Sequence, residues 1–174
     1  MNEIALRPGT PDDFPALLQM FDDAVAWLTA RGSAGQWGTE PWSGIPLQVE
    51  RVREMAGSNR LQVAEVDGVP AGVSITQGTC PRHVPSSGEP EIYLGLLLIS
   101  RRFGGLGVGG RLIANVFDEA RQSGVGLVRV DCWAGGDGNL VRYYESQGFT
   151  RTVQFEVEVR NAPWIGQVFE LRLD

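Results

Sequence analysis

The segment RRFGGLGVGGRLI, residues 101–113, contains five glycines and constrains the fold more than any other part of the chain. Residues 105–110 match the pattern G-x-G-x-x-G, and an apolar pattern of helical spacing begins in the same segment. Glycines before a helix let consecutive backbone N–H groups converge on a phosphate, to which the helix dipole adds attraction. The segment therefore predicts a phosphate-binding turn between a strand and a helix. It leaves open which cofactor carries the phosphate.

The composition excludes several classes of protein. At 174 residues the chain is long enough to bury a core and a ligand crevice, and we expect a single domain over residues 1–174. All fifteen basic residues are arginine, which excludes a P-loop and Schiff-base chemistry because both need lysine. The net charge of −6 argues against nucleic acid as a partner.

The location of the protein is predicted from its apolar runs and its cysteines. No apolar run approaches the roughly 20 residues that span a bilayer, and the start MNEIALRPG lacks the pattern of a secretory signal. Cys80 and Cys132 lie far apart without metal-ligand spacing, and His83 is the only histidine. We therefore expect reduced thiols in a cytoplasmic protein, with no metal site and no membrane contact.

The hydrophobic pattern predicts a mixed order of strands and helices. The expected elements are a strand at 3–7, a helix capped by Thr10 and closed by Gly32, a helix at 46–56, a hairpin at 61–76 turning at Asp67-Gly68, a strand at 91–99 covered on both faces, a helix at 108–122, a strand at 126–133, a helix at 138–147, and antiparallel strands at 152–160 and 166–173. On the last two strands, Val153, Phe155, Val157 and Val159 are expected to share one face, and Phe169, Leu171 and Leu173 are expected to point inward. Hairpins outnumber regular strand–helix–strand units, so we expect a mixed sheet with helices packed on it.

One hypothesis is a Rossmann NAD(P)-dependent oxidoreductase. Asp131 lies 21 residues beyond Gly110, where the ribose-binding acid of that fold is expected. Against this, five residues separate Ile99 from Gly105, about ninety residues precede the motif, and only 43 follow Asp131. These spacings leave too little chain for the remaining units of a doubly wound sheet, so this hypothesis ranks last.

The second interpretation is a family resemblance. Residues 94–149, and the element order as a whole, resemble the GNAT family of N-acetyltransferases. The family's loop, [RQ]-x-x-G-x-[GA], is best matched by residues 104–109, followed by Gly110-Arg111-Leu112-Ile113 at the helix start. Gly104 stands where the family has Arg or Gln; a register starting at Arg102 would restore the arginine but shift the helix, and Arg101, Arg102 or Arg111 are the side chains that could compensate.

The resemblance implies both a fold and a cosubstrate. The fold is α/β: a GNAT-like mixed, mostly antiparallel sheet of six to seven strands, with helices on both faces and a central splay between strands 4 and 5. The cosubstrate is acetyl-CoA, with its diphosphate on the loop and its pantetheine arm on the backbone of a bulged fourth strand, where an amide would polarise the thioester carbonyl. The cofactor-binding residues that follow are Leu97, Leu98, Ile99, Arg102, Gly104, Gly105, Leu106, Gly107, Val108, Gly109, Gly110, Arg111, Asn139 and Tyr144.

The resemblance also implies direct acetyl transfer to a primary amine. The stretch DGNLVRYYESQGF resembles the family's N-x-x-A-x-x-[LF]-Y-x-x-x-G-F, and its Tyr144 matches the tyrosine that protonates the leaving thiolate in many members. Asp137 and Asn139 are also expected to cap this helix. For the general base we expect Glu91 first and Asp131 second, with ordered water as a further alternative. Tyr93 is expected in the core.

The acceptor is expected to be a small-molecule amine. The family's acceptor region here contains several tryptophans, from which we select Gln36, Trp37, Trp42 and Trp133 as substrate residues; Trp164 lies in the same region and Trp27 is expected to fill the core. A homodimer through the last strands agrees with the family. The competing hypothesis from another class is a catalytically silent coenzyme A-binding module, suggested by Gly104 and Asp137.

Overall fold

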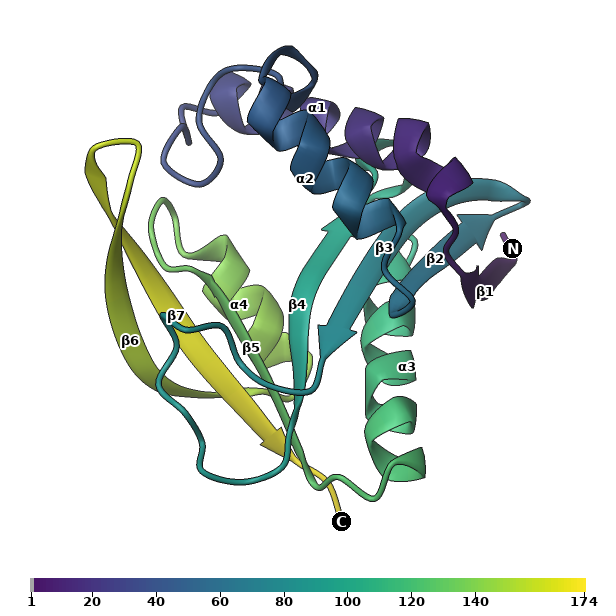
Figure 1. Ribbon diagram of the computed structural model, residues 1–174, viewed down its shortest axis with the longest axis vertical. Coiled ribbons are helices and arrows are strands. Elements are labelled where there is room, and N and C mark those ends of the chain that lie inside the picture. The colour runs from purple at the N-terminus through teal and green to yellow at the C-terminus, as the bar shows by residue number, and fades with distance from the viewer. Residues whose placement is uncertain (1) are drawn as a thin grey trace. The chain divides into compact units, whose positions relative to one another are not determined.

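A computed structural model describes residues 2–174 (Figure 1). The chain forms two compact units, of which the first comprises Met1–Ile75 with Leu96–Leu112 and the second comprises Thr76–Gly95 with Ile113–Asp174. The chain passes between the units three times: inside strand β3 (Val69–Gln77), inside strand β4 (Ile92–Ile99) and inside helix α3 (Val108–Gln122). None of the helices in residues 2–174 combines the length and apolarity that crossing a membrane requires.

The first unit holds the N-terminal strands and helices. They are β1 (Ile4–Pro8), α1 (Phe14–Ala30), α2 (Pro46–Ala56), β2 (Leu61–Val66) and β3 (Val69–Gln77). β2 pairs antiparallel with both β1 and β3. The predicted hairpin turn is confirmed: Asp67 and Gly68 both have positive φ angles, 50° and 82°, as a tight two-residue hairpin turn requires.

The second unit is built on the C-terminal strands. Its elements are β5 (Leu127–Trp133), α4 (Asn139–Ser146), β6 (Thr150–Val159) and β7 (Ala162–Arg172). β7 pairs antiparallel with both β5 and β6, while β4 pairs in parallel with β5 from Ile92↔Val128 to Leu94↔Val130. In the part of the chain that the structure describes, this parallel register covers only the first three residues of β4.

The predicted fold class is confirmed. The hydrogen-bonded order is β1-β2-β3-β4-β5-β7-β6, a seven-stranded, mostly antiparallel sheet with one parallel pair at its centre. β4 continues to Ile99 and β5 to Trp133, beyond the point where their shared register ends. This early end of the parallel register is what a central splay predicts.

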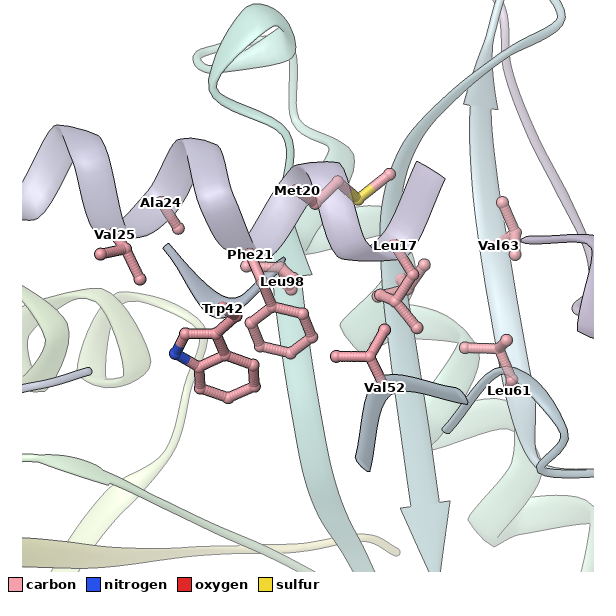
Figure 2. Packing of buried hydrophobic residues seen from close by; sticks show 11 residues of the cluster. Leu17, Met20, Phe21, Ala24, Val25, Trp42, Val52, Leu61, Val63 and Leu98 are labelled. Atoms are coloured by element: carbon pink, nitrogen blue, oxygen red, sulfur yellow. The ribbon is translucent and has the colours of Figure 1, made fainter. Parts of the chain in front are cut away.

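Two clusters of apolar side chains cover opposite faces of the sheet in the first unit. One cluster joins α1 and α2 to Leu61, Val63 and Leu98, and Figure 2 shows Phe21 and Trp42 at its centre. The other joins Ala64 and Val66 to the first turns of α3. The strand predicted at 91–99 is confirmed as covered on both faces, since Leu98 contributes to the first cluster while Leu97 and Ile99 pack against the second.

Gly72 on β3 lets the start of α3 approach the sheet. A Cβ atom at this position would lie 2.9 Å from both Ile99 Cδ1 and Val108 Cγ1, closer than packed carbon atoms normally come. The N–H of Ser100 donates a hydrogen bond of 2.8 Å to the carbonyl of Ala71, fixing the chain where it leaves β4. The glycine segment therefore begins from a rigid point.

The predicted cap at Thr10 is confirmed, with one added turn. Thr10 caps a 3-10 turn, Pro11–Asp13, and Asp13 accepts the N–H of Thr10 in return, at 2.8 Å. Asp13 also binds Arg7 at 2.7 Å, so that the pKa of this carboxyl lies below its usual range because the Arg7 hydrogen bond favours the ionised form. This contact joins the end of β1 to the start of α1.

Two predictions about single side chains were wrong. Val153 was expected to share one face with Phe155, Val157 and Val159 but is 46% exposed, because a register shift between Arg151 and Gln154 interrupts the alternation of β6. Phe155, Val157 and Val159 are half-buried, as expected for their shared face. Trp27 does not fill the core: it is 38% exposed, one position away from the buried stripe of α1.

Candidate functional site

The glycine segment forms an exposed loop between a 3-10 turn, Arg101–Phe103, and α3. Gly105 and Gly107 have φ angles of 80° and 85°, in the left-handed region that residues with a Cβ rarely adopt. No heavy atom lies within 4 Å of the position that a Cβ atom would take at either glycine. Glycine is therefore needed here for its backbone conformation and not because a side chain would clash. The predicted need for glycine at these two positions is confirmed.

The N–H groups at the start of α3 have no acceptor within the helix. The N–H of Arg111 bonds the Gly107 carbonyl at 3.0 Å, which leaves the preceding N–H groups of residues 108–110 as orphans of the first turn. Leu112 and Ile113 are 0% and 1% exposed, as the register starting at Gly104 predicts. The loop therefore presents a row of main-chain donors at the positive end of a helix dipole, which is the chemistry of an anion site.

The arginines around the loop lie in different environments. Arg102 is exposed, with its guanidinium carbon 5.3 Å from the centroid of the Phe103 ring, and Arg111 is exposed on α3. Arg101 is exposed too, but its guanidinium carbon lies 4.0 Å from the centroid of the Trp27 ring on α1. Leu97–Ile99 are predicted to contact pantetheine through their backbone atoms. The packing of their side chains does not test this contact, which stays a prediction.

Tyr144 lies in an aromatic cluster of the second unit. It is 6% exposed, and its ring is 5.6 Å from Phe169 and 6.0 Å from Phe149. Burial raises the pKa of its hydroxyl well above the ordinary range, so Tyr144 holds its proton at neutral pH. Within residues 2–174 this hydroxyl makes no hydrogen bond, and it is not among the fully enclosed polar atoms. A protonated, unengaged hydroxyl is what a general acid needs.

Asp137 and Asn139 both take part in the start of α4. Asp137 Oδ1 accepts the N–H of Asn139 at 3.0 Å, and Asn139 Nδ2 donates to Asp137 Oδ2 at 2.6 Å. Arg142 Nη2 donates to Asn139 Oδ1 at 2.5 Å. The N-cap residue of α4 is Gly138, so neither Asp137 nor Asn139 is the cap that was predicted; Asp137 instead accepts the first N–H of the helix from one position before the cap. A contact of Asn139 with the cofactor stays a prediction.

Glu91 belongs to a buried ion pair that sequence reasoning missed. Its Oε2 lies 3.1 Å from Arg129 Nη1, with both side chains about 5% exposed, and its Oε1 accepts the N–H of Cys80 at 3.0 Å. Arg129 also donates to the carbonyl of Pro85 at 2.8 Å. These contacts join the 78–90 connection to β4 and β5. The available signal was Arg129 itself, a charge in the middle of the otherwise apolar stretch LVRV.

Tyr93 and Asp131 form a second polar pair on the same face of the strands. Tyr93 is buried, as predicted, and its hydroxyl donates a short hydrogen bond to Asp131 Oδ1. Burial raises the pKa of the Asp131 carboxyl, which makes it a stronger base than an ordinary aspartate. The adjacent Cys132 is inert, because burial and then the Asp131 charge raise the pKa of its thiol to about 12.

Trp37 and Trp42 come together with Phe21 in the first unit. The Trp42 ring stacks on Phe21 with centroids 4.2 Å apart, and Trp37 lies 6.0 Å from Trp42. Trp42 Nε1 is the one fully buried side-chain polar atom without a hydrogen-bond partner in residues 2–174. Figure 2 shows this nitrogen at the edge of the cluster, turned away from Val52 and Leu61. An unpaired buried donor is costly, and it points to a missing acceptor atom.

The other selected substrate residues are half-buried. Gln36 precedes Trp37 in the loop between α1 and α2, in the first unit, while Trp133 ends β5 in the second unit with its ring over Gly135. Trp164 lies on β7, 6.1 Å from Phe155. The structure thus brings together Trp37 and Trp42, and their contact with substrate stays a prediction.

A mixed sheet with a short parallel pair at its centre, followed by a loop of free main-chain donors at a helix start, defines an α/β protein that can bind a phosphate-bearing ligand. Residues 36–168 match the family model described as an acetyltransferase (GNAT) domain, which covers most of the chain. The chain belongs to the GNAT family and is an acetyltransferase that uses acetyl-CoA.

Solved structures agree on the fold. Ribosomal-protein-alanine N-acetyltransferase from Brucella melitensis matches with a TM-score of 0.69 and 22% identity over 97% of this chain and 99% of its own. A GNAT acetyltransferase from Listeria monocytogenes matches with a TM-score of 0.69 and 19% identity over 98% and 95%. The protein yncA of Salmonella typhimurium, solved with its cofactor acetyl-CoA, matches with 0.66 and 20% over 98% and 94%. No curated protein sequence matches the chain significantly.

The residues of the loop fit coenzyme A. Its diphosphate carries negative charge and acceptor oxygens, and the loop offers orphan N–H groups, two glycines at positive φ and nearby arginines. Residues 104–107 are all exposed, so no side chain of the protein fills the place of the ligand. The loop therefore fits the cosubstrate on its own geometry.

Proposed function

We propose that the protein transfers the acetyl group of acetyl-CoA to the primary amine of a small molecule by direct attack on the thioester. The observation that carries the proposal is the loop in which Gly105 and Gly107 adopt positive φ before the uncapped first turn of α3. Such a nest binds a diphosphate in preference to a neutral ligand, since it supplies only donors. When bound, acetyl-CoA supplies an activated acyl group.

Tyr144 is the proposed general acid. Its hydroxyl is protonated at neutral pH, as that of any tyrosine with a pKa near or above 10, and none of the described residues engages it. In this role Tyr144 donates its proton to the thiolate sulfur as the coenzyme leaves, which removes the cost of releasing an unprotonated thiolate. The backbone of Leu97–Ile99 is proposed to bind the pantetheine arm.

For the general base, Glu91 and Asp131 remain the two candidates, and their contacts favour Asp131. The Glu91 carboxylate already neutralises the buried Arg129 guanidinium, and protonating it would leave that cation without a counter-charge. Among residues 2–174, the Asp131 carboxylate accepts a hydrogen bond only from the neutral hydroxyl of Tyr93, and burial raises its pKa toward the range in which bases work at neutral pH. Asp131 can therefore accept the proton of the amine without breaking an ion pair.

The acceptor is proposed to contact the aromatic residues of the first unit. Trp37 and Trp42 offer flat faces, and the unpaired Trp42 Nε1 offers a donor for an oxygen of the acceptor molecule. Gln36, which precedes Trp37 in the chain, is proposed as a further contact. An acceptor that carries a carbonyl or carboxylate near its amine fits this donor.

The experiment is a thiol-release assay. Purified protein, acetyl-CoA and a thiol reagent are mixed with a panel of small amines and, because one structural neighbour is named for ribosomal-protein alanine, with a peptide that has an N-terminal alanine. We expect thiol release with a small amine, reduced about tenfold or more in Tyr144→Phe. The half-buried neighbour gives the matched control, since Tyr143→Phe should retain activity.

The alternatives give different results in the same experiment. Stabilisation of the protein by coenzyme A without thiol release for any amine would support a silent binding module instead. Release that depends only on the peptide would contradict the small-molecule acceptor. Stabilisation by NAD or NADP and none by coenzyme A would support the oxidoreductase.

We also propose a cytoplasmic location and a homodimer through the last strands. Cys80 and Cys132 are both free thiols, which agrees with a reducing compartment. β6 is an outer strand in the order of the sheet, so its outer edge can pair with a second copy. Light scattering should then give twice the mass of 18.9 kDa. The monomer mass would contradict the dimer.

A further inference from the structure

Two arginines of the first unit lie against one exposed tryptophan. The guanidinium carbon of Arg101 lies 4.0 Å from the centroid of the Trp27 ring, and that of Arg31 lies 4.6 Å from the same centroid. Trp27 lies on α1, Arg31 at its C-terminal cap, and Arg101 in the 3-10 turn before the glycine loop. Segments some seventy residues apart in sequence are thus joined by cation–π contacts.

Like charges brought this close repel each other. Arg101 is exposed, but the partial burial of its guanidinium, and then the charge of Arg31, lower the pKa of this group below its usual value. Within residues 2–174, the side chain of Arg101 makes neither an ion pair nor a hydrogen bond. A chain with a net charge of −6 thus provides no carboxylate for Arg101, which indicates that its charge is directed at an anion from outside.

The place of the Arg101 side chain connects it to the phosphate loop. Its Nη2 lies 3.6 Å from the position that a Cβ atom would take on Gly104. Gly104 is the residue that stands where the GNAT motif has Arg or Gln, so the chain lacks a side chain there. The Arg101 guanidinium therefore lies beside the very position at which the motif would have placed a polar side chain.

We propose that Arg101 supplies the cation for the coenzyme diphosphate that Gly104 cannot supply, and that Trp27 and Arg31 hold its guanidinium in place. This inference rests on the proposed function, namely that the loop binds coenzyme A. Arg101 would bind phosphate oxygens through its planar fork of N–H donors. Trp27 and Arg31 are positioning residues. The Trp27 ring restrains the Arg101 side chain, and repulsion between the two positive charges orients the Arg101 guanidinium away from Arg31.

Arg53 provides the matched control. Like Arg101 it is exposed and lies over an aromatic ring, with its guanidinium carbon 4.2 Å from the centroid of the Phe14 ring. Loss of either arginine changes the net charge by the same amount. Only the loss of Arg101 removes a side chain that the structure holds next to Gly104.

The test is titration calorimetry of coenzyme A into the full chain. We expect Arg101→Gln to weaken binding about tenfold or more, since hydrogen bonds to charged groups are among the strong ones. Arg53→Gln should stay within about twofold of the original chain. Trp27→Leu should weaken binding severalfold, and Arg101→Lys should fall between Arg101→Gln and the original chain because lysine keeps the charge but not the fork.

A double variant separates positioning from a general structural effect. If Trp27 acts through Arg101, Trp27→Leu with Arg101→Gln should bind no more weakly than Arg101→Gln alone. Additive losses would overturn the role of Trp27. Equal binding by Arg101→Gln and Arg53→Gln would overturn the role of Arg101, as would an increased acceptor KM with an unchanged coenzyme Kd. Absence of coenzyme binding by the original chain would overturn the proposed function itself.

Discussion

The hydroxyl of Tyr93 on β4 donates a hydrogen bond to the carboxylate of Asp131 on β5. The two residues are 38 positions apart, the same separation that joins Glu91 to Arg129 in the buried ion pair. Residues two apart on a strand share a face. The parallel register of β4 and β5 therefore places both pairs on the same face of these two strands, within the second unit. One pair is a neutralised ion pair, whereas the other leaves a single carboxylate with a neutral donor.

This difference predicts the pH dependence of Tyr93→Phe. The Tyr93 hydrogen bond stabilises ionised Asp131 and so opposes the increase in pKa that burial causes. Removing it should raise the pKa of Asp131 further. Because a general base works only when ionised, the rate is lost as pH falls through this pKa. The acidic limb of the kcat/KM profile should therefore move to higher pH.

The same profile tests Asp131 directly. Asp131→Asn should lower kcat/KM by about a hundredfold or more and remove the acidic limb. If Asp131→Asn kept both the rate and the limb while Glu91→Gln lost them, Glu91 would be the base. An unchanged profile in Tyr93→Phe would show that this hydrogen bond does not act on a catalytic group.

Glu91→Gln is expected to act mainly on stability. It leaves the Arg129 guanidinium buried without a counter-charge, which typically costs about 3–5 kcal/mol when one partner of a buried pair is removed. Chemical denaturation measures this loss. The exposed pair of Glu89 with Arg172 supplies the control, since Glu89→Gln should leave the denaturation midpoint nearly unchanged. Similar midpoints for the two variants would contradict the structural role of the buried pair.

Gly107→Ala should weaken coenzyme A binding by about tenfold. Alanine at a φ of 85° is strained by about 1–2 kcal/mol, and the free loop can escape this strain by leaving the conformation that binds. Gly104 has a φ of −61°, so Gly104→Ala adds a methyl group without this strain. Titration calorimetry compares the two. Equal affinities would show that the left-handed conformation of the loop is not needed.

Trp42→Phe should raise the KM for the acceptor amine by about two- to tenfold, the contribution of one hydrogen bond. The aromatic stacking on Phe21 can be retained, while the unpaired Nε1 donor is removed. Steady-state kinetics at saturating acetyl-CoA measures the change. The Kd of coenzyme A serves as the internal control and should not change. An unaltered acceptor KM would exclude Nε1 as a contact of the acceptor.

The local pattern of the sequence was sufficient for the fold. The apolar stretch at 91–99 and the turn at Asp67-Gly68 predicted a two-faced central strand and a hairpin, and both are confirmed. The glycines at 105 and 107 predicted left-handed backbone for the same reason: the residue type itself limits the conformation. Val153 failed because a register shift in β6 depends on its pairing with β7, which no local pattern encodes.

The partners of charged side chains could not be predicted. The pairing of Glu91 with Arg129 depends on the register between two strands, and the contacts of Arg101 and Arg31 with Trp27 depend on where a turn meets the end of a helix. Helical spacing placed Trp27 near the buried stripe but could not show that arginines would cover it. The unpaired Trp42 Nε1 likewise becomes visible only when all the neighbours of the ring are known.

The central claim is that the turn at residues 104–110 binds the diphosphate of coenzyme A, and titration calorimetry of the unaltered protein tests it most directly. We predict a saturable heat with coenzyme A and acetyl-CoA at one site per chain, and none with NAD or NADP. Absence of binding by coenzyme A and its acetylated form, or equal binding of NAD, would contradict the account.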